Sequence, residues 1–355
     1  MSECTRISEI LSFITTPAFS VRGDIITECN DAARRIHLEE GTALSSLFPQ
    51  GLTEYPPVKN GCLFLTLNHH QQSYQTSVTA LDDACLFILE EDTDQIELKT
   101  LSLTAANMRQ PLSSVIATTA TLNSALKDTD DPKIRAQLQH MNRNLCRMHR
   151  MLCNMSDAMQ YADGTSNNLV CQNIVSVVEN IFQQAQTLCQ HSGVHFEYSV
   201  PKEDVLCAID EALLERSIYN MISNAIKFSP EGSIIQGTLC HQNDRIYISI
   251  QDQGDGIPNS ILNSIFQRYQ RQPALEDTRF GLGLGLVLVR CAARVHNGTV
   301  LVDHPGDAGT RVTISFSVRQ RTSSLVRSNI ARVDYTGGWD HALLELSDVM
   351  PAELY

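Results

Sequence analysis

The sequence predicts an α+β chain of several domains, in which a small α/β module is followed by an antiparallel helical hairpin and then by an α/β sandwich. Three observations lead to this fold class. The chain has 355 residues, a length typical of two to three domains. From 93 to 163, apolar residues recur at every third or fourth position with one break, as in two long helices. Beyond residue 164, helical and alternating patterns interleave, as in a sheet covered by helices.

The composition narrows the classes of function. The chain has 27 basic and 40 acidic residues and a net charge of −13, which argues against nucleic acid as its main partner. No apolar run approaches the length of a membrane span, and no basic-then-apolar start marks a signal peptide, so we expect a soluble, cytoplasmic protein. The eleven cysteines include no C-x-x-C pair and no matched metal spacing, so we expect reduced thiols.

Residues 1–92 are expected to form the first module. Asn30 is placed to cap a helix that continues to Ile36. Apolar alternation bounded by polar turns predicts the strands of this module at 17–21, 25–26, 61–67, 73–81 and 84–90.

Residues 93–163 are expected to form two long helices separated by the Asp-rich break at 128–132. The apolar positions of the first helix are Leu101, Ala105, Met108, Leu112, Val115, Thr119, Leu122 and Leu126. Those of the second helix are Leu138, Met141, Leu145, Met148, Leu152, Met155 and Met159. One hairpin does not cover both apolar seams, so the pattern predicts a dimeric four-helix bundle.

Residues 164–319 contain the features that indicate a ligand site. An apolar strand through Ile248 ends at Asp252, which is followed by glycines at 254 and 256. A second cluster, at 281–286, has three alternating glycines before an apolar run that starts a helix. Glycines before a helix N-terminus let backbone amides approach phosphate oxygens, and the helix dipole adds to the attraction.

The predicted helix from Asp210 to Lys227 carries a polar face. Asn220 and Asn224 lie four residues apart and Lys227 follows one turn later, so the three side chains share one side of the helix. Two amides and an ammonium group suit Mg²⁺ and phosphate oxygens.

These stretches together resemble the ATP-binding domain of bacterial sensor histidine kinases. The N, G1, F and G2 boxes of that family correspond here to residues 220–227, 252–258, 265–269 and 281–286, in the family's order and spacing. By the same comparison, residues 1–92 resemble a PAS sensory domain. The hairpin resembles the family's dimerisation and histidine-phosphotransfer domain.

The resemblance implies ATP and Mg²⁺ as cofactors. Asn224 would hold the metal, Asp252 would hydrogen-bond the adenine amino group, and residues between Phe266 and 280 would form a lid. The implied cofactor-binding positions are Asn220, Asn224, Lys227, Asp252, Gly254, Gly256, Ile257, Phe266, Gly281, Gly283, Leu284, Gly285, Leu286 and Thr310.

The sequence departs from the family at the phosphoacceptor. The family motif is His-Glu-x-x-x-Pro-Leu, and its proline and leucine correspond to Pro111 and Leu112. The nucleophile position is Ala106 and the neighbouring acid is Asn107. Alanine has no nitrogen to accept a phosphoryl group, and an amide does not take up a proton as a carboxylate does.

Several functions remain open on this basis. Plain ATP hydrolysis is disfavoured, because the position of the glutamate base in related ATPases is Asn220 here. The chain would be a pseudokinase that signals to a response regulator, or a kinase acting on a histidine of another chain, as a homodimer or a heterodimer. The alternatives are a response-regulator phosphatase using Gln110 and a nucleotide-gated scaffold without enzyme activity.

Residues 320–355 lie outside the family core. They are rich in arginine at first and then contain a short candidate helix around Leu343, Leu344 and Leu346. We expect this tail to pack back on the ATP-binding domain.

Overall fold

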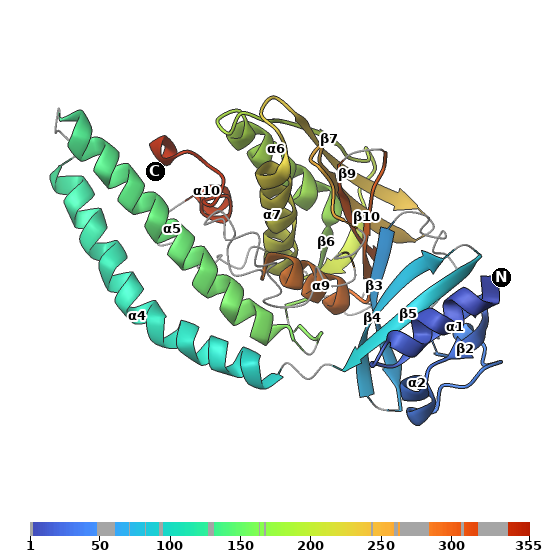
Figure 1. The fold of residues 1–355 in the computed structure, drawn as a ribbon. Coiled ribbons are helices and arrows are strands. Elements are labelled where there is room, and N and C mark those ends of the chain that lie inside the picture. The colour runs from blue at the N-terminus through green and yellow to red at the C-terminus, as the bar shows by residue number, and fades with distance from the viewer. Residues whose placement is uncertain are drawn as a thin grey trace.

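The computed structural model describes residues 3–47, 61–70, 72–81, 83–91, 95–126, 131–162, 164–166, 168–242, 244–258, 262, 284–306, 309–318 and 340–355. In these ranges, two long helices connect an N-terminal sheet to a C-terminal layer of helices on a sheet, as Figure 1 shows. The mixed α+β fold class predicted from the sequence is confirmed.

The N-terminal module contains each strand that the sequence predicts, together with a first helix that it does not. Its elements are α1 (Glu3–Phe13), β1 (Ala18–Arg22), β2 (Ile25–Cys29), α2 (Asp31–Arg35), α3 (Leu44–Leu47), β3 (Gly61–His69), β4 (Gln72–Leu81) and β5 (Ala84–Glu91). Asn30 caps α2, since its Oδ1 atom accepts from the amide of Ala33 at 2.9 Å. The same oxygen accepts from Ala18 at 3.0 Å, which joins the start of the helix to β1.

The two long helices are α4 (Gln95–Ala125) and α5 (Pro132–Gln160), which run side by side (Figure 1). Pro111 lies inside α4 and removes one backbone donor, which accounts for the curvature of this helix in Figure 1. Asp131 caps α5, accepting from the amide of Lys133 at 2.9 Å, and Pro132 occupies the first turn, where its missing N–H is not needed.

The C-terminal layer is a mixed sheet with helices α6, α7 and α9 packed against it around one core. Its elements are β6 (Val170–Asn173), α6 (Ile174–Cys189), β7 (His195–Ser199), β8 (Leu206–Ile209), α7 (Glu211–Phe228), β9 (Ile234–Gln242), β10 (Arg245–Gln251), α9 (Gly285–Val295), β11 (Thr299–Asp303) and β12 (Arg311–Ser317). Strand β7 is parallel to β9, whereas β10 is antiparallel to both β9 and β12. The sequence did not predict β9.

One sheet runs through both modules. Its ten strands follow the order β2-β1-β5-β4-β3-β11-β12-β10-β9-β7. The junction is the antiparallel pair β3–β11, in which Phe64 lies opposite Val300 and Cys62 opposite Val302. The sequence did not predict this junction, because backbone pairing between distant strands leaves no local pattern.

Strand β3 contributes to two cores, and its composition explains why. Cys62 and Phe64 belong to the core of the C-terminal layer. Leu63, Leu65 and Leu67 alternate with them and belong to the core of the N-terminal module. A strand buried on both faces is apolar at successive positions, as this one is.

The C-terminal segment folds back as α10 (His341–Glu345) and the short 3₁₀ helix η2 (Ala352–Leu354). Ala342, Leu346 and Met350 are spaced by four residues and are buried in the core of the C-terminal layer, which agrees with the predicted packing of the tail. The segment also contacts α5, which was not predicted. Asn142 of α5 donates to the carbonyl of Tyr355 at 3.1 Å.

Candidate functional site

Asp252 lies just beyond the end of β10, at the centre of the candidate site. It is 8% exposed. Its Oδ1 atom accepts hydrogen bonds from the backbone amides of Gly254 and Thr310, each 2.9 Å long. Burial raises the pKa of this carboxyl group, and the two amide bonds oppose the rise. Because both bonds end on the same oxygen, they fix the plane of the carboxylate.

Two of the glycines around Asp252 are required by close backbone approaches. A Cβ atom on Gly254 would lie 2.3 Å from the carbonyl oxygen of Phe228, at the end of α7. A Cβ atom on Gly309 would lie 2.3 Å from the carbonyl oxygen of Asp252, and the φ of Gly309 is +91°. The amide of Gly309 donates to the carbonyl of Gly254 at 2.7 Å. Side chains at these two positions would therefore force the walls of the site apart.

His304 closes the same site, and sequence reasoning missed it. The residue follows β11 directly. Its Nδ1 atom lies 2.9 Å from the carbonyl oxygen of Gly309, and its Nε2 atom lies 2.9 Å from that of Ile257. His304 thus ties the predicted position Ile257 to the loop before β12, and a Cβ atom on Gly256 would meet its ring at 3.2 Å.

The polar face of α7 borders the start of α9, as the site prediction requires. Asn220 is 2% exposed, Asn224 is half-buried, and the Lys227 side chain is 14% exposed. A Cβ atom on Gly285 would lie 3.0 Å from the Oδ1 atom of Asn220. The helix with the two asparagines and the first residue of α9, Gly285, are therefore in contact.

The remaining predicted positions divide into two groups. Phe266, Gly281 and Gly283 lie outside the described residues. Leu284 is buried immediately before the first residue of α9, and Leu286 packs against the core from the first turn of that helix.

An ionic cluster on the polar face of α7 was not predicted. Asp348 of the C-terminal segment lies 3.2 Å from Nζ of Lys227 and 2.8 Å from a terminal nitrogen of Arg150, on α5. The other terminal nitrogen of Arg150 donates to Oδ1 of Asn220 at 2.8 Å. Two predicted phosphate-side residues are therefore engaged by other parts of the chain. The only signal in the sequence is the run of arginines on α5, which does not reveal its partners.

A second carboxylate completes this ionic cluster. Glu345 is 1% exposed and lies 3.5 Å from Nε of Arg150 and 3.6 Å from Nε of Arg216. Arg216 also pairs with Asp157 of α5. Burial raises the pKa of Glu345, and the two arginines oppose the rise.

Asp348 and Lys227 respond differently to burial. Burial alone would raise the pKa of Asp348, but Arg150 and Lys227 outweigh it and the pKa is lowered. Asp348 is therefore a carboxylate at neutral pH. Burial lowers the pKa of Lys227, and Asp348 opposes that change.

The predicted phosphoacceptor position, Ala106, lies on α4. Ala106, Asn107 and Gln110 are all exposed on this helix. Among the described residues, no group of three or more His, Cys, Asp and Glu side chains is suited to hold a metal ion.

Comparison with known proteins identifies the class of the domain that holds the site. Residues 209–320 match the model of the histidine kinase-, DNA gyrase B- and HSP90-like ATPase family. This region contains Asp252, the polar face of α7 and the start of α9. Residues 209–320 are therefore similar to the ATPase domains that this family model describes.

The individual matches extend the similarity to sensor histidine kinases. The adaptive-response sensory kinase SasA of Synechocystis sp. is 29% identical over 232 residues, covering 61% of this chain and 60% of that protein. The hybrid signal transduction histidine kinase D of Dictyostelium discoideum is 27% identical over 232 residues, covering 63% of this chain and 15% of that protein. The chain thus spans less than two thirds of the length of either relative.

One solved structure shares the fold over a similar extent. Full-length ShkA in complex with AMPPNP has a TM-score of 0.50 and 18% identity, covering 63% of this chain and 47% of that one. No helix in the described ranges is both long and apolar enough to cross a lipid bilayer.

Proposed function

We propose that the chain binds Mg·ATP in the site around Asp252. The observation that carries this proposal is the buried carboxylate of Asp252, held by the amides of Gly254 and Thr310. A carboxylate in this position suits the exocyclic amino group of adenine, with Oδ2 as the accepting atom. Because Gly254 and Gly309 have no side chain, the backbone packs closely around Asp252 and holds its carboxylate in place.

The phosphates would lie along the polar face of α7. Asn220, Asn224 and Lys227 share this face, and Gly285 brings the start of α9 against Asn220. The amide oxygen of Asn224 would be the protein ligand of Mg²⁺, which usually takes few protein ligands together with phosphate oxygens and water. The bound metal would neutralise phosphate charge, while the N-terminus of α9 and Lys227 stabilise what remains.

We further propose that this chain signals to a response regulator without a phosphoacceptor of its own. The acceptor position on α4 is Ala106, which offers no nucleophilic atom. Two activities fit this arrangement. As a pseudokinase, the chain would use ATP to bias its conformation. As a kinase acting in trans, it would phosphorylate a histidine of another chain.

Phosphatase activity toward a response regulator is a third candidate. The observation that favours it is the exposure of Gln110, one turn after Ala106 on α4. An exposed amide at this point is free to orient a water molecule toward a docked phosphoaspartate.

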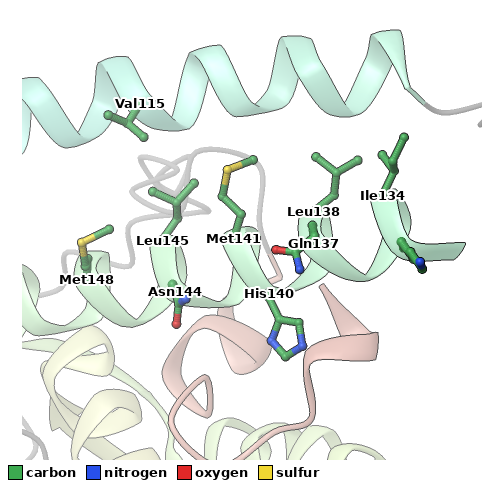
Figure 2. A pocket seen from close by; sticks show the side chains of 10 residues that line it. Val115, Ile134, Gln137, Leu138, His140, Met141, Asn144, Leu145 and Met148 are labelled. Carbon is green, nitrogen blue, oxygen red and sulfur yellow. The ribbon is translucent and has the colours of Figure 1, made fainter. Parts of the chain in front are cut away.

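The proposed domains are a PAS-like sensory module at 1–92, the hairpin at 93–163, the ATP-binding domain at 164–319 and the tail at 320–355. We propose that two copies of the chain pair through the hairpin. An apolar groove of about 640 Å³ lies along α4 and α5, lined by Val115, Leu145 and Met148 among others (Figure 2). His140 and Asn144 point away from α4 in this view. The side chains of Val115 and Met148 remain 48% and 45% exposed, so a second hairpin is the natural cover for them.

Calorimetry with Mg·ATP tests the binding proposal. We expect one nucleotide per chain, and absence of binding by this chain and by its Asp348→Asn variant alike would refute the proposal. Incubation with γ-labelled ATP then separates the activities. Label on an added histidine-bearing kinase or phosphotransfer protein indicates action in trans, and label on neither chain indicates a pseudokinase. Loss of label from a phosphorylated regulator, abolished by Gln110→Ala, indicates a phosphatase.

A further inference from the structure

The C-terminal segment 340–355 brings two carboxylates to the polar face of α7. Asp348 contacts the Lys227 ammonium group at 3.2 Å and Arg150 at 2.8 Å, and its other oxygen lies 3.2 Å from Nε of Arg147. Glu345 lies between Arg150 and Arg216, at 3.5 and 3.6 Å. Figure 1 shows α10 between α5 and α7.

The charges at this contact are unequal without the segment. The cations are Arg147, Arg150, Arg216 and Lys227, and the carboxylates are Asp157, Glu215, Glu345 and Asp348, with Glu215 3.1 Å from the imidazole of His341. If the segment left, Glu345, Asp348 and His341 would leave with it, and four cations would face the two carboxylates of Asp157 and Glu215. A mostly buried patch of this sign attracts a polyanion, and a triphosphate is one.

The segment engages groups that the nucleotide proposal assigns to the phosphates. Lys227 pairs with Asp348. Asn220 is held by Arg150, which Asp348 itself positions through the ion pair at 2.8 Å. The carboxylate of Asp348 thus pairs directly with the ammonium group of Lys227. It also positions Arg150, which in turn holds the side-chain amide of Asn220. Lys227 does not bind Asp348 and a phosphate oxygen with its full strength at the same time.

The segment is anchored by apolar residues, but some polar atoms of its ionic contacts lack a hydrogen-bond partner. Ala342, Leu346 and Met350 are buried in the core, which gives the docked state its stability. Within the described residues, however, Nε of Arg150 and Oε2 of Glu345 are buried without a hydrogen-bond partner. Buried charges that lack full hydrogen bonding weaken the contact between the segment and its cations. A triphosphate offers more oxygen atoms and therefore competes strongly for the same cations.

We propose that segment 340–355 is an internal competitor of the nucleotide, with Asp348 in the place of a phosphate oxygen. This proposal rests on the proposed binding of Mg·ATP and adds a form of regulation to it. With the segment docked, Lys227 and Asn220 are engaged and affinity is low. Release of the segment frees both residues, and anything that binds the released segment or excludes it from α5 would raise the affinity for ATP.

Calorimetry on the full chain tests this with Asp348→Asn, which removes the charge and keeps the shape. If the segment is docked in about nine molecules of ten, only about one in ten is free to bind, and the apparent affinity for Mg·ATP falls about tenfold. We therefore expect the variant to bind Mg·ATP about tenfold more tightly than the wild type. Glu353→Gln is the matched control. It removes one negative charge from the same segment, at an exposed residue. The hydrogen bond from Gln139 goes to the backbone carbonyl of Glu353 and not to its carboxylate, so the substitution leaves that bond in place. We expect no change in affinity for this control.

The outcomes separate this proposal from the one on which it rests. Equal or weaker affinity in Asp348→Asn, with wild-type affinity intact, overturns the competitor and leaves ATP binding in place. No binding by the wild type together with binding by the variant supports the competitor. No binding by either chain overturns both proposals.

Hydrogen exchange on the wild-type chain provides an independent readout if the variant does not fold. We expect the backbone amides of residues 342–350 to exchange faster in saturating Mg·ATP than without it. Unchanged or slower exchange there would overturn the competitor.

Discussion

The site around Asp252 and the site around Ala106 are built in opposite ways. Asp252 is buried, its carboxylate is held by two backbone amides, and the glycines beside it tolerate no side chain. Ala106 and its neighbour Asn107 are exposed on α4, and neither side chain carries a nucleophile or a base. The first region has the buried, ordered carboxylate that the proposed nucleotide site requires, and the second is the predicted phosphoacceptor position without a side chain that accepts a phosphoryl group.

Under the proposed function, nucleotide binding and phosphotransfer depend on different parts of the chain. Binding depends on contacts within 209–320, whereas transfer depends on one side chain of α4.

Restoring the acceptor is the most direct way to break the contrast. We expect the double variant Ala106→His, Asn107→Glu to become labelled by γ-labelled ATP, because an imidazole nitrogen then replaces a methyl group at an exposed helix position. The unmodified chain should take up no label. Label should also be absent when Asp252→Ala is added to the double variant. If the double variant binds ATP and stays unlabelled, the pocket does not support transfer, which favours the pseudokinase.

Removing the carboxylate of Asp252 should abolish most nucleotide binding. Asp252→Ala loses a charged hydrogen bond to the adenine, together with the two bonds that order Gly254 and Thr310. At about 1.5–3 kcal/mol for a hydrogen bond to a charged group, we expect affinity for Mg·ATP to fall about 10- to 100-fold by calorimetry. The exposed neighbour gives the control Asp255→Asn, which should bind as the wild type does. Equal affinity in the two variants would contradict the placement of the adenine.

A charge in the apolar groove should separate two paired copies. Val115→Asp places a carboxylate among side chains that a second hairpin would bury, and burying an unpaired charge is costly. We expect the dimer to dissociate at concentrations at least about tenfold higher than for the wild type, measured by light scattering after size exclusion. Ser114→Asp adds the same charge at the adjacent exposed position and should leave the dimer intact. A wild-type monomer would refute the pairing, and dimerisation only with a different kinase chain would replace the homodimer by a heterodimer.

The smallest expected effect is a pH dependence of the C-terminal segment. Burial alone would lower the pKa of His341, but Glu215 of α7, whose Oε1 atom lies 3.1 Å from Nδ1, outweighs it and the pKa is raised. Glu345 raises it further, and Arg216 opposes the rise. A raised histidine pKa stabilises the folded state fully below about 6.5, and this contribution is lost as pH rises through the folded-state value.

We therefore expect the segment to be held more weakly at pH 8 than at pH 6, by about 1 kcal/mol or less. Hydrogen exchange of residues 342–350, corrected for the intrinsic effect of pH, measures this difference. His341→Gln should remove it. A segment that is held more tightly at pH 8 would show that Glu215 does not stabilise the imidazolium.

Local patterns in the sequence were sufficient to predict most helices and strands. Alternating apolar residues predict β10, and the spacing of Asn220, Asn224 and Lys227 predicts a shared face of α7, because both periodicities are set by a single element. The glycines at 254 and 256 are also a local signal, because they closely follow β10 in the sequence.

Features that depend on distant partners were missed. His304 is one histidine after a strand, and its role depends on carbonyl groups of Gly309 and Ile257 that only the folded sheet brings to it. Asp348 is one acid in a tail, and its partner Arg150 lies 198 residues earlier in the chain. Neither side chain has an unusual sequence context, so the sequence alone offered no basis for assigning them.

The pairing of β3 with β11 makes a mechanical connection between the first module and the nucleotide pocket. Four consecutive residues of β11, ending at Asp303, are paired with β3, and His304 is the next residue in the chain. If the N-terminal module tilts, either the pairing of β3 with β11 breaks or β11 moves with the module. In the second case the imidazole of His304, which contacts the carbonyl groups of Gly309 and Ile257, moves as well. A disturbance at the far edge of the sheet thus has a covalent and hydrogen-bonded route to the proposed nucleotide site that bypasses the long helices.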